Sequence, residues 1–188
     1  MIYLASTSPR RRLLLKQAGI RFRVFCPPYE EKDDPRVSVR VLVKRHALGK
    51  ALSAVPRVRN GVIVGADTVV VREGSLSGKP RSMRHAEEML GRLQGKWHTV
   101  LTAVALLRVR NGKITRKLVF AETTRIKLRK LGRAELKSYL KRIRPLDKAG
   151  AYAIQSTVRG IVERVRGSFS NAVGLPIEKL KKHIRMLR

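Results

Sequence analysis

The first residues that could do chemistry follow a short apolar stretch at the start of the chain. Residues 2–5 predict a buried strand, and Ser6, Ser8, Arg10 and Arg11 come directly after it. Ser8, which precedes a proline, is typical of a helix cap. The unpaired N–H groups and positive dipole of a helix start favour an anion, so the motif predicts a phosphate cradle. The alternative is that Ser8 only caps the helix and the arginines are solvated.

A lone acid, Asp67, follows the apolar run Val62–Val64. A carboxylate at the end of a buried strand is costly unless it is paired, hydrogen-bonded or bound to a metal. Asp67 is therefore a candidate general base or Mg²⁺ ligand, and the alternative is a structural acid paired with a nearby cation. Thr68 beside it could bind a substrate or simply favour a strand.

Three further polar residues are candidates by their position. Lys79 lies in a Gly-Lys-Pro turn, where the proline would fix the backbone, whereas Lys50 lies on a predicted helix whose solvated face would also explain a lysine. Gln155 ends the stretch "DKAGAYAIQ", and its amide could read the edge of a nucleobase or be satisfied within the fold. The stretch "GSFSNAVGLP", residues 167–176, by itself predicts a structured turn into the last helix.

The amino-acid composition limits the classes of protein to which the chain can belong. Of 188 residues, 43% are hydrophobic, which is enough to bury a core, and the net charge is +30. Such a charge would attract nucleic acid or a polyanionic small substrate such as a nucleotide. The single cysteine, Cys26, excludes an internal disulfide framework and is expected in the core.

Several classes of protein are disfavoured by missing patterns. No run of 18 apolar residues predicts a membrane-spanning helix, and the N-terminus lacks the pattern of a secretory signal, so we expect a cytoplasmic protein without membrane contact. No Walker A loop is present. The four histidines are scattered, and none has metal-ligand spacing with a neighbouring histidine or acid.

The pattern of segments predicts an α/β protein with a mixed sheet flanked by helices. Asn111-Gly112 is a strong signal for a tight hairpin turn. The expected strands are residues 21–25, 61–71 (interrupted at 65–68), 100–110, 113–128 and 160–165, with a short strand in the loop 145–155. The expected helices are residues 10–18, 34–54, 83–93 and 134–142, with a last helix starting at 175.

The order of these motifs resembles the Maf family of nucleoside triphosphate pyrophosphatases, over essentially the whole chain. The motifs that carry the resemblance are "LASTSPRRRLLL", Glu30-Glu31, Lys50-Ala51, "GADTVV", Gly78-Lys79-Pro80, "DKAGAYAIQ" and "GSFSNAVGLP". The resemblance implies one Maf-like domain over residues 1–188. Its expected fold is an elongated mixed sheet with helices and two lobes with a central cleft, similar to the inosine triphosphate pyrophosphatases.

The resemblance also implies an activity. It indicates the branch that hydrolyses dTTP and UTP, with CTP or modified pyrimidine nucleotides as further substrates, to the monophosphate and pyrophosphate. A divalent cation, Mg²⁺ or Mn²⁺, would assist, and homodimers are common in the family. The implied catalytic residues are Asp67, Lys50 and Lys79; the implied substrate-binding residues are Ser6, Arg10, Arg11, Glu31, Thr68 and Gln155; the implied metal ligands are Asp67 and Glu31.

The competing hypothesis is a basic nucleic-acid-binding protein without catalytic activity. Aromatic residues make up only 5% of the chain, so platforms for stacking bases are sparse. No zinc finger or RNA-recognition signature is present. The basic segment 179–188 could contact RNA, or it could pack Leu180, Ile184 and Leu187 against the sheet.

Overall fold

The structure is a computed structural model that describes residues 1–32, 34–154 and 160–187. Its strands belong to one seven-stranded sheet of order β2-β1-β3-β5-β6-β7, with β4 paired to β3. The strands are β1 (Ile2–Ala5), β2 (Phe22–Phe25), β3 (Gly61–Arg72), β4 (Ser75–Ser77), β5 (Trp97–Arg110), β6 (Lys113–Leu128) and β7 (Val162–Arg166). The helices are α1 (Pro9–Gln17), α2 (Val39–Leu52), α3 (Met83–Leu93), α4 (Arg133–Ile143), α5 (Phe169–Val173) and α6 (Ile177–Met186).

The predicted mixed α/β fold is confirmed. Strand β1 pairs in parallel with both β2 and β3, whereas β3–β4 and β6–β7 are antiparallel. The hairpin turn between β5 and β6 has positive φ at both Asn111 (49°) and Gly112 (75°), as a tight type I′ turn requires. None of the helices in the described part of the chain is long and apolar enough to cross a membrane.

The chain divides into two compact units, and β3, β5 and β6 contribute residues to both. Unit 1 comprises Met1–Asp67, Thr102–Glu122 and the residues from Gly174 onward; unit 2 comprises Thr68–Leu101 and Thr123–Val173.

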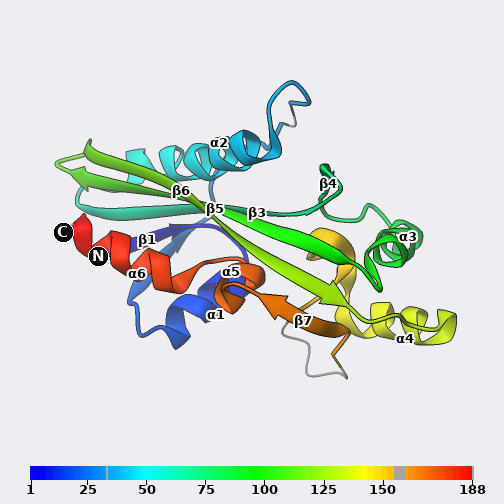
Figure 1. Cartoon of the computed structure of the whole chain (residues 1–188). Helices are drawn as coiled ribbons and strands as arrows, with labels where there is room; N and C mark the ends of the chain where they lie inside the picture. The colour runs from blue at the N-terminus through cyan, green and yellow to red at the C-terminus, as the bar shows by residue number, and fades with distance from the viewer. Residues whose placement is uncertain (33, 155–159, 188) are drawn as a thin grey trace. The chain divides into compact units, whose positions relative to one another are not determined.

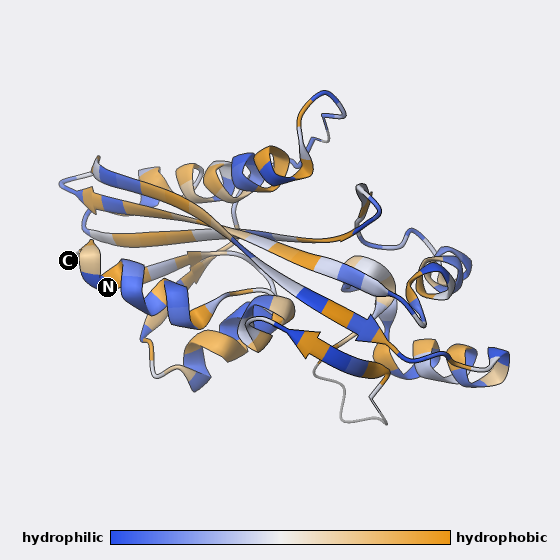
Figure 2. Cartoon of the chain, viewed as in Figure 1, coloured by the Kyte–Doolittle hydropathy of each residue, from blue (hydrophilic) through white to orange (hydrophobic). Residues whose placement is uncertain are grey.

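In unit 1, α2 covers one face of the sheet, and α1 and α6 cover the other (Figure 1). Helix α6 alternates hydrophobic and hydrophilic residues (Figure 2), and it buries Leu180 and Ile184, with Leu187 just after its end. Its Lys179 pairs with Glu122 of β6, and its His183 packs against Phe120. The packing alternative for the C-terminal segment is therefore confirmed for its apolar residues.

In unit 2, helices α3 and α4 pack around one apolar cluster, whose largest fully buried side chain is Tyr139. Gly150 lies inside this packing with φ of 71°, and a Cβ there would come within 2.9 Å of Val70. Residues 145–154 contain two short 3₁₀ turns, Pro145–Asp147 and Ala149–Ala151, and no strand. The predicted short strand is wrong for these residues, because Gly150 requires a conformation that a strand does not provide.

Three local predictions for residues 26–68 are also wrong. Helix α2 begins at Val39, not at Asp34, because Ser38 accepts from the Val41 N–H as the N-cap, while Asp34 accepts from the Arg36 N–H in a turn of its own. Strand β3 runs without interruption through Asp67, whose carboxylate finds a partner. Cys26 is exposed, since it follows the edge strand β2.

A buried histidine in unit 2 makes stability depend on pH. His98 is 3% exposed, and its Nε2 lies 2.8 Å from the Tyr152 hydroxyl. Burial lowers the pKa of His98 from 6.5 to about 4. Between these values the unfolded chain takes up a proton that the folded protein does not, so stability is present above pH 6.5 and falls as the pH falls toward 4.

We expect the free energy of unfolding to be about 2 kcal/mol lower at pH 5 than at pH 8 on this account. Urea unfolding at the two pH values measures it. In His98→Gln this difference should shrink by about that amount, and an unchanged pH dependence in the variant would contradict the assignment.

Candidate active site

Strands β1 and β2 of unit 1 end at the same level, where the neighbouring strand β3 reaches Gly65 and continues to Arg72. In the register, Ala5 of β1 lies opposite both Phe25 of β2 and Gly65 of β3. Ser6 directly follows β1, and the non-helical residues 26–32 and 34–38 follow β2. Asp67 lies two residues beyond Gly65. In open α/β sheets ligands bind outside the carboxyl ends of the strands, so the candidate site is this edge, formed by the ends of β1 and β2 beside Asp67 of β3.

Gly65 explains how α2 meets β3 at this edge. A Cβ at Gly65 would lie 2.2 Å from the Ala47 carbonyl oxygen and 2.7 Å from the Ala51 nitrogen. Only glycine permits this approach. Because alternate strand residues face the same side, Asp67 points toward α2 as Gly65 does, and it meets the residue that precedes Ala51.

That residue is Lys50, and it joins two carboxylates. Its Nζ lies 2.8 Å from Asp67 Oδ1 and 2.5 Å from Glu31 Oε1. The Lys50 and Asp67 side chains are 11% and 9% exposed, whereas Glu31 is 47% exposed. The pairing offsets the cost of burying both charges. It also brings together three of the residues predicted from the sequence.

Ser6 and Arg11 form a second group at the same edge. Ser6 is buried, and its Oγ accepts from Arg11 Nη1 at 3.1 Å and from the Ser8 N–H at 3.2 Å. Arg11 Nε also donates to the Gly174 carbonyl oxygen at 2.9 Å. Arg11 thus ties the loop between β1 and α1 to the segment before α6, in addition to any contact it makes with a ligand.

The two groups share one electrostatic environment. Burial lowers the pKa of Arg11, and Arg10 acts in the same direction, whereas the charges of Asp67 and Glu31 act in the opposite direction. Arg10 is half-buried in the first turn of α1. The N-cap of that helix, Ser8, makes no capping hydrogen bond with its side chain, so the capping alternative does not account for this serine.

Of the remaining predicted residues, Thr68 and Lys79 belong to unit 2. Thr68 is half-buried and points to the opposite face of β3 from Asp67. Lys79 is exposed, and the turn that holds it is fixed because the Gly78 carbonyl accepts from the Gly150 N–H at 3.1 Å. Two motifs singled out in the sequence therefore meet within unit 2. Gln155 lies outside the described residues.

The stretch "GSFSNAVGLP" is structural in its described contacts. It contains the short helix α5, and Asn171 is fully buried. Asn171 Nδ2 donates to Thr124 Oγ1 at 2.9 Å and to the Val100 carbonyl oxygen at 3.3 Å. These bonds agree with the predicted structured turn.

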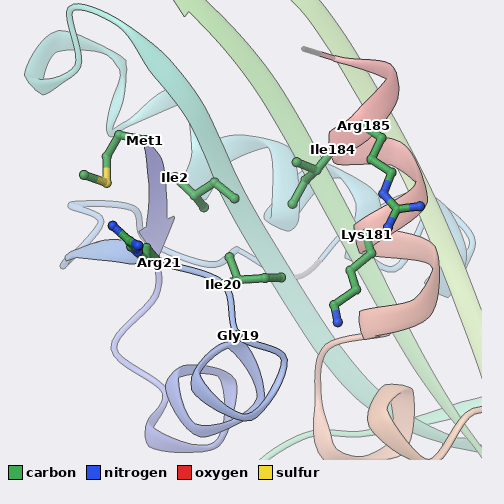
Figure 3. A pocket seen from close by; sticks show the side chains of 8 residues that line it. All are labelled: Met1, Ile2, Gly19, Ile20, Arg21, Lys181, Ile184 and Arg185. Carbon is green, nitrogen blue, oxygen red and sulfur yellow. The ribbon is translucent and has the colours of Figure 1, made fainter.

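A cavity of about 560 Å³ lies elsewhere in unit 1, at the amino end of β1 (Figure 3). Apolar side chains and cations both line it, and none of the predicted site residues does. The cavity is therefore separate from the cluster around Lys50. Its lining residues are Met1, Ile2, Gly19, Ile20, Arg21, Lys181, Ile184 and Arg185.

Two kinds of residue near the site were not predicted from the sequence: a glycine that permits close packing, and a pair of hydrogen-bonded side chains. The role of Gly65 could have been predicted, because a glycine inside an apolar strand indicates close approach of another backbone. Tyr29 and His46, whose side chains are hydrogen-bonded to one another at 3.0 Å, carried no signal, since nothing local indicates that residues 17 positions apart will meet.

The chain matches one protein family over nearly its whole length and is similar to several named proteins. The profile of the family described as "Maf-like protein" matches residues 1–187. A dTTP/UTP pyrophosphatase of Gloeobacter violaceus is 44% identical over 95% of this chain and 92% of its own length. One of Dictyoglomus thermophilum is 38% identical over 99% and 95%. A solved nucleoside-triphosphatase / dITP/XTP pyrophosphatase of Mycobacterium abscessus covers 99% of this chain and 95% of its own, at 16% identity and a TM-score of 0.44, a likeness too weak to carry an argument.

Proposed function

Because the chain belongs to the family of Maf-like proteins, we propose that it hydrolyses dTTP and UTP to the nucleoside monophosphate and pyrophosphate. Relatives named dTTP/UTP pyrophosphatase, 38–44% identical over nearly the whole chain, support this activity. The main support for the proposal is the cluster in which Lys50 joins Asp67 of β3 and Glu31 beside the carboxyl ends of β1 and β2. CTP and modified pyrimidine nucleotides are proposed as further substrates.

The cluster suits attack of water at the α-phosphorus. The oxygen of the water bonds to that phosphorus, the bond from phosphorus to the bridging oxygen breaks, and pyrophosphate leaves. Asp67 accepts the proton of the water as general base. Lys50 and Arg10, with the first-turn N–H groups of α1, stabilise the negative charge of the phosphates.

The donor set fits a hard divalent cation. Mg²⁺ is usually held by one or two carboxylates together with substrate phosphates and water, and Asp67 and Glu31 both reach the same Lys50 ammonium. No group of three or more histidine, cysteine or acidic side chains in the described part of the chain could hold a metal alone. Asp67 and Glu31 would hold Mg²⁺ or Mn²⁺, which when bound would neutralise phosphate charge and acidify a water.

The family resemblance supplies the remaining parts of the proposal. Ser6 and Arg11 contact the phosphates, Lys79 faces the triphosphate, and Arg10, Thr68 and Gln155 take part in the choice of base. We also propose that residues 1–188 act as one Maf-like domain and that the protein forms a homodimer, which light scattering would test.

A second candidate function follows from the charge. Thirteen acidic residues cannot neutralise 43 basic ones, and the proposed chemistry uses only a few of the cations. Nonspecific contact with the nucleic-acid backbone would use the others. If this were the main function, binding would fall steeply with salt and show no preference for sequence.

A panel of nucleoside triphosphates tests the first candidate against the second. With Mg²⁺ or Mn²⁺ present, we expect dTTP and UTP to release pyrophosphate and monophosphate in equal amounts, and purine nucleotides to react more slowly. Ion chromatography measures both products. Release of inorganic phosphate instead of pyrophosphate would contradict the reaction. No turnover of any nucleotide, together with salt-sensitive RNA binding, would favour the second candidate.

A further inference from the structure

The loop that carries Glu31 contacts α2 at a second point, two residues earlier. The Tyr29 hydroxyl lies 3.0 Å from Nδ1 of His46, and the two rings meet edge-on with centroids 5.9 Å apart. His46 is 3% exposed, so it is a fixed anchor. It lies on α2 four residues before Lys50, which holds Glu31.

The distance between the two contacts along α2 is one that the loop can span. Tyr29 and Glu31 are two residues apart, and two residues of chain span at most roughly 6.6 Å when extended. Four residues of helix, from His46 to Lys50, rise about 6 Å on one face. Tyr29 and Glu31 therefore contact α2 at two residues one helical turn apart.

Gly49 makes room for the tyrosine. A Cβ at Gly49 would lie 2.1 Å from Cε2 and 2.5 Å from Cζ of the Tyr29 ring. Glycine weakens the interior of a helix, so its presence beside Lys50 needs a reason, and the ring of Tyr29 provides one. The tyrosine ring thus packs on the backbone of α2 next to the residue that holds both carboxylates.

We propose that Tyr29 is a positioning residue for the reaction: its contacts with His46 and Gly49 hold Glu31 against Lys50, so that Glu31 and Asp67 are assembled before the nucleotide arrives. This role rests on the proposed function, because it assigns Tyr29 to the acidic pair that serves the triphosphate. Tyr29 touches no reacting atom and acts through Glu31.

The variant Gly49→Ala tests the proposal, with Gly91→Ala as matched control. Both glycines lie inside helices, but a Cβ at Gly91 meets nothing within 4 Å. Gly49→Ala displaces the Tyr29 ring, and we expect kcat/KM for dTTP to fall by about tenfold, since small displacements of catalytic groups have large effects. Amide hydrogen exchange over residues 29–32, measured without nucleotide or metal, should become faster. Gly91→Ala should change neither quantity.

A double-mutant cycle separates positioning from general damage to the fold. If Tyr29 acts through Glu31, Gly49→Ala should cause no further loss of kcat/KM in a Glu31→Gln background. An equal tenfold loss in both backgrounds would overturn the proposal. Tyr29→Phe, which keeps the ring, should cause a smaller loss of about threefold, and Tyr3→Phe, whose ring stacks on Phe25 in the same unit, should cause none.

The exchange measurement tests the contact between the loop and α2 separately from the hydrolysis of nucleotides. If the wild-type protein releases no pyrophosphate, the function fails, and the role of Tyr29 in the reaction fails with it, while faster exchange in Gly49→Ala would still establish the loop anchor. If the protein is active and the loop exchanges at the wild-type rate in Gly49→Ala, only the positioning role is overturned.

Discussion

Replacing Asp67 with asparagine should lower kcat for dTTP by at least about 100-fold and leave the fold intact, since loss of a general base typically costs this much or more. The amide keeps the size of the side chain but cannot accept the proton of the attacking water. The fold should persist because the buried ammonium of Lys50 still has Glu31 as partner, at 2.5 Å. Steady-state kinetics measures the first effect, and urea unfolding measures the second.

Glu88→Gln is the matched control for Asp67→Asn. It removes the same charge from an exposed ion pair with Arg84 on α3, where pairs contribute little. Its kcat should equal that of the wild type. If Asp67→Asn kept more than about a tenth of the wild-type kcat, Asp67 would not be the general base, because the loss would fall below the range for such a group.

Replacing Lys50 with methionine should affect stability as well as activity. The change leaves the buried carboxylate of Asp67 without its cation, beside a second carboxylate of the same charge. Breaking a buried pair from one side costs about 3–5 kcal/mol, so we expect the free energy of unfolding to fall by roughly 3 kcal/mol. Turnover of dTTP should also be lost, since the variant lacks the cation that joins the acidic pair.

Two further variants test this explanation. Lys44→Met makes the same change on the same helix at a half-buried position outside the cluster, and its stability and activity should stay near those of the wild type. The double variant Lys50→Met/Asp67→Asn should regain much of the lost stability, because no unpaired buried charge remains, while staying inactive. A stable single variant would show that the pair does not hold this edge of the sheet.

The elements that the sequence predicted well are those whose signals are local. Asn111-Gly112 predicts a turn because both residues tolerate the positive φ that they adopt. Ser8 and the proline after it predict the start of α1, where the structure also begins the helix. The start of α2 was placed too early, since Asp34 and Ser38 both have cap chemistry and only the hydrogen bond to Val41 distinguishes them.

The members of the site could be named from the order of their motifs, but their partners could not. Lys50 is one of 43 basic residues, and only the close approach of α2 to Gly65 selects it as the partner of Asp67. Burial of Arg11 against the Gly174 carbonyl joins residues 163 positions apart, a contact that no local pattern encodes.

The sequence by itself determined most of the helices and strands and the hairpin turn, because backbone propensities and capping depend on neighbouring residues. Asp67 was a candidate from its place after an apolar run, and Glu31 from the resemblance to the Maf family. The tertiary structure alone decided that Lys50 joins Glu31 and Asp67, and that Tyr29 packs on Gly49. Those contacts depend on how closely a helix can approach a strand or a loop, a distance set by side chains far apart in the chain.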